Sequence, residues 1–250
     1  MQIETSGGVA VLPMRAGKAN AIGSAFLERL SAQLDAVEAS GAAALVLTGE
    51  GRAFSAGLDL PAISALDRGA LERFIRRFSE LMLQVFTLPV PVVAAINGHA
   101  IAGGCVLAMQ ADVRLAAAGD YRIGLNEVAI GLGLPAVVLE TLRCQVSPRS
   151  LGPVALEGRL LSPEEAQTFG LVEAVLPPAV LLEQARGRAA ELAALPRPAF
   201  RDVKQALRGP VAAAVRRVER EDARRWVETA FSTAARERLT EVVARLSRPR

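Results

Sequence analysis

The sequence predicts an α/β fold, in which short buried strands alternate with helices. Short apolar runs bounded by glycine or proline recur along the first three quarters of the chain, and amphipathic stretches with an apolar residue every three or four positions separate them. Of the 250 residues, 51% are hydrophobic and 22% are charged, a composition typical of a globular chain with a sizeable core. Because only 4% are aromatic, that core must consist mainly of aliphatic side chains.

The elements follow from these patterns in chain order. Apolar residues at Phe26, Leu30 and Leu34 predict an amphipathic helix over Ser24–Ala39. Further helices are expected at 67–86, at 105–110 and after Pro135, and the capping-box sequence at 162–165 marks another helix start. Strands are expected at 8–14, 43–48, 90–96, 113–117, 121–125 and 171–176.

No charged residue occurs from Leu81 to Ala111, a length that raises the question of a membrane span. Prolines at 89 and 91 and the pairs Asn97-Gly98 and Gly103-Gly104 interrupt the run, which therefore predicts a buried strand, a turn and a buried helix. We expect no membrane association.

Everything after Pro177 is predicted to be helical, with breaks at Pro196, Pro198 and Gly209-Pro210. We thus expect a core over residues 1–190 and a C-terminal helical region over 191–250. Residues 201–250 hold 13 Lys or Arg against 7 Asp or Glu. Both signs are mixed at helical spacing, which favours a solvated helix face over a nucleic-acid site.

The scarce residue types exclude several classes of site. Two cysteines, Cys105 and Cys144, cannot form a disulfide framework, and we expect both to be core thiols. One histidine, His99, argues against a His-rich metal site or a transition-metal cluster, and we expect no metal. The start of the chain has no signal-peptide pattern, so we expect a reducing, cytoplasmic location.

Two segments of the sequence are similar to each other. Each has a buried strand, a glycine turn and small residues ending in Ala-Gly: 45–49 leads to 54–58, and 93–98 leads to 101–104. A strand that leads into a helix start leaves backbone NH groups without partners. Two such segments side by side are predicted to aim two NH donors at one oxygen, although the glycines of either segment alone would equally suit close packing.

Three ordered stretches carry a resemblance to a known family: GRAFSAGLDL at 51–60, AINGHAIAGGC at 95–105 and IGLNE at 123–127. They resemble the signature stretches of the crotonase (enoyl-CoA hydratase/isomerase) superfamily. The resemblance implies a spiral of ββα turns and a C-terminal helical trimerisation region, hence a homotrimer or a dimer of trimers. It also implies an acyl-CoA thioester substrate, with coenzyme A arriving as part of the substrate and no permanently bound cofactor.

The same resemblance implies roles for individual residues. Two backbone NH groups, those of Leu58 and Gly103, would hold an enolate oxygen, and Glu127 would be the catalytic base. Apolar neighbours should raise the pKa of Glu127 toward a value useful for proton transfer. Residues placed along the coenzyme A moiety would be Lys18, Ala19, Ala53, Ser55, Ala56 and Leu60.

One departure from the family pattern is informative. Hydratases of this family carry a second glutamate three residues after the oxyanion-hole glycine, where this sequence has Val106. Moving a double bond from the 3,4 to the 2,3 position requires only one carboxylate, so the sequence favours an enoyl-CoA isomerase. Enoyl-CoA hydration, epimerisation and decarboxylation stay open as alternatives, as does a non-catalytic acyl-CoA-binding protein.

Overall fold

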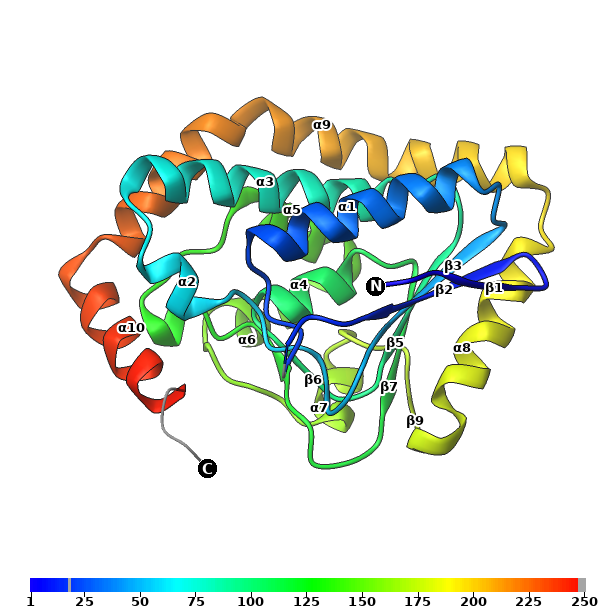
Figure 1. Ribbon diagram of the computed structural model, residues 1–250, viewed down its shortest axis with the longest axis horizontal. Helices are drawn as coiled ribbons and strands as arrows, with labels where there is room; N and C mark the ends of the chain where they lie inside the picture. Colours follow the sequence, from blue (N-terminus) through cyan, green and yellow to red (C-terminus); the bar gives the residue numbers. More distant parts are fainter. Residues whose placement is uncertain (18, 247–250) are drawn as a thin grey trace.

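The fold is built on two sheets of mostly parallel strands. The computed structural model describes residues 1–17 and 19–246. The larger sheet has the order β1-β2-β3-β5-β7-β9, and only β1 and β2 pair antiparallel (Figure 1). Its strands are β1 (Glu4–Ser6), β2 (Val9–Met14), β3 (Ala44–Gly49), β5 (Val92–Ile96), β7 (Val113–Ala117) and β9 (Ala174–Leu176). The smaller, parallel sheet consists of β4 (Ala53–Ser55), β6 (His99–Ile101) and β8 (Ile123–Gly124).

Helices connect the strands in a repeating order. After β4 come α2 (Leu60–Ser64) and α3 (Arg68–Phe86), after β6 comes α4 (Gly103–Met109), and after β8 come the 3-10 helix η1 (Val128–Ile130) and α5 (Ala136–Gln145). The turns that begin at β3, β5 and β7 thus each add one strand to each sheet and then a helix, which confirms the predicted α/β spiral of ββα turns. The other helices are α1 (Ser24–Ala39), η2 (Pro148–Ser150), α6 (Leu151–Ala155), α7 (Pro163–Thr168), α8 (Pro178–Ala193), α9 (Arg197–Ala230) and α10 (Thr233–Leu246).

Both faces of the larger sheet are largely buried from β2 to β7, which explains why these strands are nearly continuous apolar runs. Along β2, Ala10 and Leu12 face the main core, to which α1, α3, α4, α5 and α9 contribute. The alternate residues Val9 and Val11 pack with Ala185 and Ala189 of α8 on the other face. Within the described residues, no helix is both long and apolar enough to cross a membrane; the uncharged run became β5, β6 and α4.

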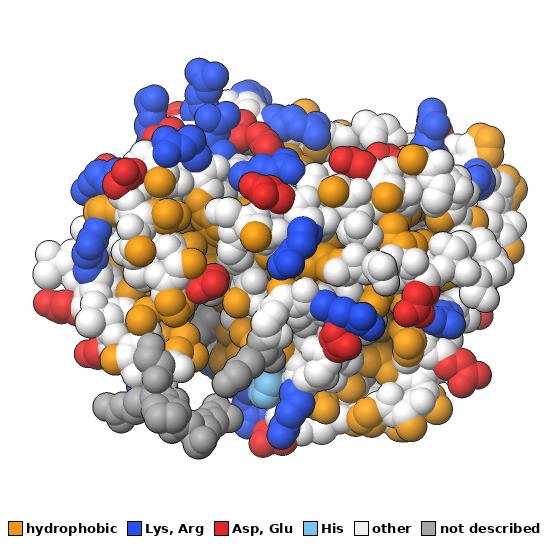
Figure 2. All heavy atoms as spheres, in the orientation of Figure 1, with side chains coloured by type: hydrophobic (Ala, Val, Ile, Leu, Met, Phe, Trp, Pro, Cys, Tyr) orange, Lys and Arg blue, Asp and Glu red, His pale blue; other side chains and the backbone are white. Residues whose placement is uncertain are grey.

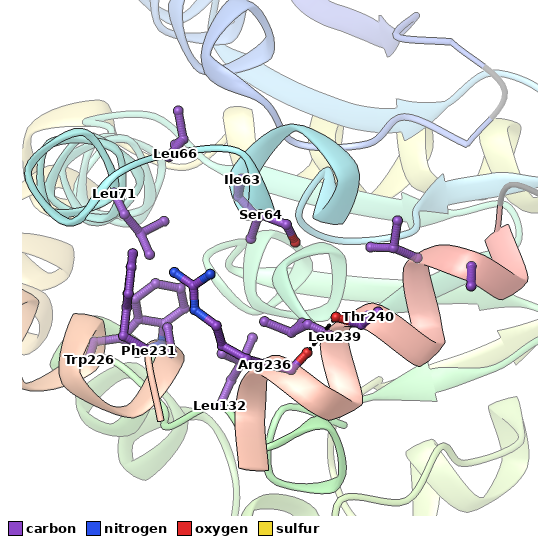
Figure 3. Close-up of a pocket in the computed structure, with 13 residues that line it drawn as sticks. Ile63, Ser64, Leu66, Leu71, Leu132, Trp226, Phe231, Arg236, Leu239 and Thr240 are labelled. Atoms are coloured by element: carbon purple, nitrogen blue, oxygen red, sulfur yellow. Dashed lines mark hydrogen bonds between the residues drawn. The ribbon is translucent and has the colours of Figure 1, made fainter. Parts of the chain in front are cut away.

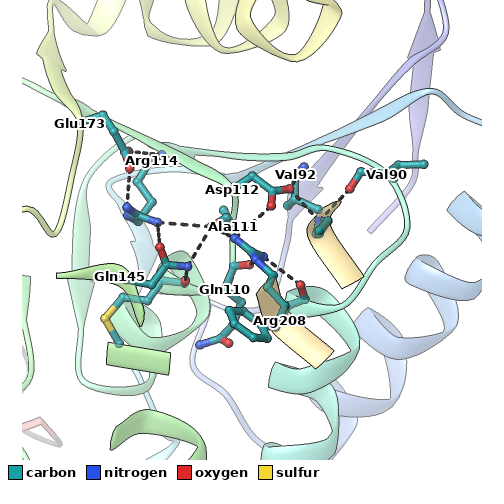
Figure 4. A network of polar contacts seen from close by, with 12 residues as sticks. Val90, Val92, Gln110, Ala111, Asp112, Arg114, Gln145, Glu173 and Arg208 are labelled. Atoms are coloured by element: carbon teal, nitrogen blue, oxygen red, sulfur yellow. Dashed lines mark hydrogen bonds and ion pairs between the residues drawn. The ribbon is translucent and has the colours of Figure 1, made fainter. Parts of the chain in front are cut away.

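The predicted break at Gly209-Pro210 is wrong, because α9 runs through Pro210 for 34 residues. Anchors on both sides of the proline hold the helix. On one side, Lys204 and Arg208 pair at 2.7 and 2.9 Å with the carboxylate of Asp112, which is 14% exposed (Figure 4). On the other, the Trp226 indole NH donates to the Gly133 carbonyl at 2.8 Å. These contacts offset the hydrogen bond that proline removes, a cost of about 3 kcal/mol in a helix.

Further differences concern the surface. Cys105 is buried as predicted, but Cys144 is exposed near the end of α5, so the expectation of a core thiol there is wrong. Many of the Lys and Arg side chains in Figure 2 lie along the edge where α9 runs, as expected for a solvated helix face. The expected boundary near residue 190 falls within α8, and the division into two units stays a prediction.

Candidate active site

Two backbone turns meet where the strands of the smaller sheet end. Parallel pairing of β4 with β6 aligns Ser55 with Ala100, and the chain then turns at Gly57 and at Ala102. Both residues have positive φ, +87° and +49°. A Cβ atom at Gly57 would lie 2.6 Å from the Ile101 carbonyl oxygen, so only glycine allows the two turns to touch.

The residues after these turns, Leu58 and Gly103, present neighbouring amides. Hydrogen bonds on either side fix the Leu58 segment: the Ile22 NH donates to the Gly57 carbonyl at 2.8 Å, and the Asp59 NH donates to the Ile22 carbonyl at 3.1 Å. Gly103 is the first residue of α4, where helix geometry supplies no acceptor for its NH. Within residues 1–17 and 19–246, neither amide has a hydrogen-bond acceptor. The structure therefore brings together the two predicted donors.

A buried asparagine that the sequence reasoning missed holds this region together. Asn20 has φ +51° and donates through Nδ2 to the carbonyls of Ala53 and Phe54, at 3.1 and 3.2 Å. Its own carbonyl accepts the Ser55 hydroxyl at 2.8 Å. Asparagine tolerates the left-handed conformation better than most residues, so its place in the string Gly-Lys-Ala-Asn-Ala was the signal available.

The predicted coenzyme A residues fall into two groups. The side chains of Ala53 and Ser55 are buried, and that of Ser55 is occupied by hydrogen bonds within the loop. Ala56 is exposed, and Ala19 and Leu60 are partly exposed, so the side chains of these three are accessible from solvent. Lys18 lies outside the described residues.

Glu127 lies three residues after β8, at the start of η1. Its carbonyl accepts hydrogen bonds from the NH groups of Ile130 and Leu132, at 3.0 and 2.9 Å, which fixes the backbone. The residue is 8% exposed, and its Oε2 atom has no hydrogen-bond partner among the described residues. Burial raises the pKa of Glu127 to about 7, the expected direction, although the neighbouring Val128 and Ala129 are themselves exposed.

The carboxyl group of Glu127 lies near α4. Its charge contributes, after burial, to raising the pKa of the Cys105 thiol to about 12. Cys105 lies two residues after Gly103, and Val106 beside it is fully buried in the main core. The start of α4 thus has a free amide at Gly103 and the Glu127 carboxyl group nearby. Val106, an apolar residue, occupies the position where hydratases of the family carry a second glutamate.

A cavity of about 330 Å³ lies among residues that follow the Leu58 and Glu127 segments in the chain and residues of the two C-terminal helices (Figure 3). Its walls come from α2, the start of α3, the loop after Glu127, the end of α9 and α10. Most lining side chains are apolar, including Ile63, Leu71, Leu132, Trp226, Phe231 and Leu239. Its size lies within the range of small-molecule sites. Across the part of the chain that the structure describes, no group of three His, Cys, Asp or Glu residues is placed to hold a metal ion.

Comparison with known proteins identifies the family. The model of the enoyl-CoA hydratase/isomerase family matches residues 4–245. This chain therefore belongs to the enoyl-CoA hydratase/isomerase family, the crotonase superfamily.

Individual relatives carry names of both activities. A putative enoyl-CoA hydratase of Thermus thermophilus is 40% identical over 164 residues, a match covering 64% of this chain and only 64% of that protein. Human mitochondrial enoyl-CoA delta isomerase 1 is 30% identical over 196 residues, or 77% of this chain and 65% of that protein. A crystal structure of the human mitochondrial delta3-delta2-enoyl-CoA isomerase superposes with a TM-score of 0.94 at 28% identity, covering 98% of this chain and 97% of that one.

Proposed function

We propose that this protein converts 3-enoyl-CoA thioesters into 2-enoyl-CoA thioesters with Glu127 as the single proton carrier. The observation that carries this proposal is the Glu127 carboxyl group. Only two acidic residues among those described are buried, Glu127 and Asp222, and Asp222 is engaged by Arg225 and by the Ala136 NH. Glu127 alone keeps a carboxyl oxygen free for a substrate.

The proposed reaction moves one proton. The carboxylate of Glu127 takes a proton from C2, the C2–H electron pair forms a C1–C2 double bond, and the carbonyl pair moves onto the thioester oxygen, which gives a dienolate that still contains the 3,4 double bond. The NH groups of Leu58 and Gly103 stabilise that oxygen, each preorganised donor contributing about 10² to 10³ in rate. The protonated Glu127 then returns the proton to C4: the 3,4 electron pair forms the new C4–H bond, the C1–C2 pair shifts to the 2,3 position, and the thioester carbonyl re-forms. A pKa of about 7 suits a group that must accept and then donate a proton near neutral pH.

Coenzyme A enters this proposal as part of the substrate, with no permanently bound cofactor. Ala19, Ala56 and Leu60 line its path with their side chains, and Ala53 and Ser55 through their backbone. A Lys18 contact with a phosphate group belongs to the same proposal. The cytoplasmic location stays a prediction.

The test is to assay the purified protein with a 3-enoyl-CoA and a 2-enoyl-CoA side by side. We expect isomerisation to exceed hydration by a factor of about 100 or more, since losing one positioned acid-base group costs about 10² to 10⁴ in rate. Hydration comparable with isomerisation would favour the hydratase function that the name of the Thermus relative describes. Absence of both reactions, with acyl-CoA binding intact and no exchange of α-protons in heavy water, would favour a binding protein.

We also propose that the chain forms a homotrimer or a dimer of trimers. Support comes from apolar side chains that α9 leaves exposed, among them Val203, Leu207 and Val218, which closed symmetry would bury. Light scattering at micromolar concentration should give a trimeric or hexameric mass. A monomeric mass would exclude the assembly.

A further inference from the structure

The wall of the cavity carries a solvent-exposed guanidinium group, that of Arg236, which has no carboxylate partner among the described residues. Two guanidinium groups lie over the Phe231 ring, that of Arg68 at 4.6 Å from the ring centroid and that of Arg236 at 4.2 Å. Arg68 has a carboxylate partner, Glu228, at 2.6 Å. Arg236 has none in the part of the chain that the structure describes, and no acidic residue is among the described residues that line the cavity.

The cavity lies downstream of both segments of the proposed site. From the Leu58 donor the chain enters α2, where the Ile63 NH donates to the Asp59 carbonyl at 2.9 Å and Ile63 lines the cavity. From Glu127 the chain reaches Leu132, which lines the cavity from the other side. An acyl chain whose thioester lies between the two donors and Glu127 would extend into this space.

Helix α10 closes the cavity and brings Arg236 to it. The residue before Arg236, Ala235, is fully buried against Gly131, where a Cβ atom would lie 2.8 Å from the Ala235 Cα. Glycine at position 131 therefore allows α10 to pack directly on the segment that follows Glu127. Figure 3 shows the Arg236 side chain extending from α10 into the cavity beside the Phe231 ring, with Ser64 facing it from α2.

We propose that the acyl chain of the substrate ends in a carboxylate that Arg236 binds, so that the substrates are coenzyme A thioesters of unsaturated dicarboxylic acids. This inference rests on the proposed function for the position of the thioester. The apolar walls suit the methylene groups of the chain, and the planar guanidinium matches a carboxylate with two parallel hydrogen bonds. The Phe231 ring beneath the guanidinium holds it in place while leaving its NH groups free for a ligand.

Calorimetric titration with two saturated ligands tests the inference without requiring turnover. Hexanoyl-CoA and adipoyl-CoA have the same six-carbon chain and differ only in its end, a methyl group or a carboxylate. We expect the wild-type protein to bind adipoyl-CoA about 10- to 100-fold more tightly, the usual range for a charge-assisted hydrogen-bonded pair. Arg236→Gln should abolish the preference and leave hexanoyl-CoA affinity within about twofold, and Arg236→Lys should keep part of it.

Arg238→Gln is the matched control, because Arg238 lies on the same helix and pairs with Glu241 at 3.2 Å outside the cavity. This variant should keep the wild-type preference. Equal affinity of the wild-type protein for both ligands would overturn the inference, as would an Arg236→Gln variant that weakens both ligands equally. Binding of neither ligand would overturn the proposed function together with it. A clear preference for adipoyl-CoA in a protein without isomerase activity would support the inference and contradict only the proposed reaction.

Discussion

Two regions in the interior of this molecule differ in whether their charged side chains have partners. Around Asp112, every charge has partners: its carboxylate binds Lys204 and Arg208, and the Arg208 guanidinium also donates to the Phe86 and Gln110 carbonyls at 2.8 and 2.9 Å. A neighbouring buried cation, Arg114, pairs with Glu173 (Figure 4). At Glu127, by contrast, a carboxyl oxygen is buried without a partner.

Burial shifts the pKa of Lys204 and that of Glu127, but only the shift of Lys204 is opposed by a nearby opposite charge. The pKa of Lys204 falls to about 8 because burial outweighs the attraction of Asp112. The pKa of Glu127 rises to about 7 because burial acts almost unopposed. A paired buried charge fastens one element to another, here α9 to the strand ends, whereas an unpaired one costs stability and stays available for chemistry.

The largest effect is expected from Glu127→Gln, which keeps the shape of the side chain and removes the proton carrier. We expect isomerase activity to fall by about 10² to 10⁴. Glu140→Gln is the control, because Glu140 is a carboxylate on α5 that pairs with Arg143. Near-normal turnover by the Glu127→Gln enzyme would show that another group carries the proton.

Removing the shared carboxylate should break the paired region. Asp112→Asn leaves two buried cations without a counter-charge, and we expect the free energy of unfolding to fall by about 3 to 5 kcal/mol. Glu241→Gln, which breaks the exposed pair with Arg238, should cost less than about 1 kcal/mol. Denaturant titration at one protein concentration measures both. A similar small loss in the two variants would contradict the role assigned to Asp112.

The free energies of unfolding of the wild type and of Glu127→Gln should diverge as the pH rises. The folded protein holds the Glu127 proton up to pH of about 7 and the unfolded chain only to about 4.5, so rising pH between these values lowers the stability of the wild type. Glu127→Gln lacks this loss, and its advantage should grow by about 3 kcal/mol across the window and then level off. Parallel stability curves from pH 4 to 8 would show that the carboxyl group is not desolvated.

The sequence was most informative where one residue type leaves few alternatives. Strands β2, β3, β5 and β7 were predicted because both faces of the sheet are largely buried there and the runs are mostly apolar. The internal similarity of two segments indicated that two NH donors could meet, and the resemblance to the crotonase signature stretches assigned those donors to Leu58 and Gly103 and the base to Glu127. Strands as short as β4 and β1 gave no periodicity to detect.

Other features depend on tertiary contacts that a sequence pattern does not contain. Pro210 stays helical because Asp112 and Gly133, remote in the chain, anchor α9. The cavity brings Ile63 together with Phe231 and Arg236, and no local spacing relates these positions. Only the fold of the complete chain shows that they share one space.

The alanine at position 102, with φ +49°, has a consequence for how the turn is prepared. Such a backbone costs a non-glycine residue about 1 to 3 kcal/mol, which a glycine would avoid. Glycine, however, would also widen the range of shapes open to the turn and to the unfolded chain. Alanine at this position therefore costs some stability but narrows the range of conformations open to the turn. The Gly103 amide keeps one orientation without a ligand, so no binding energy would be needed to orient it.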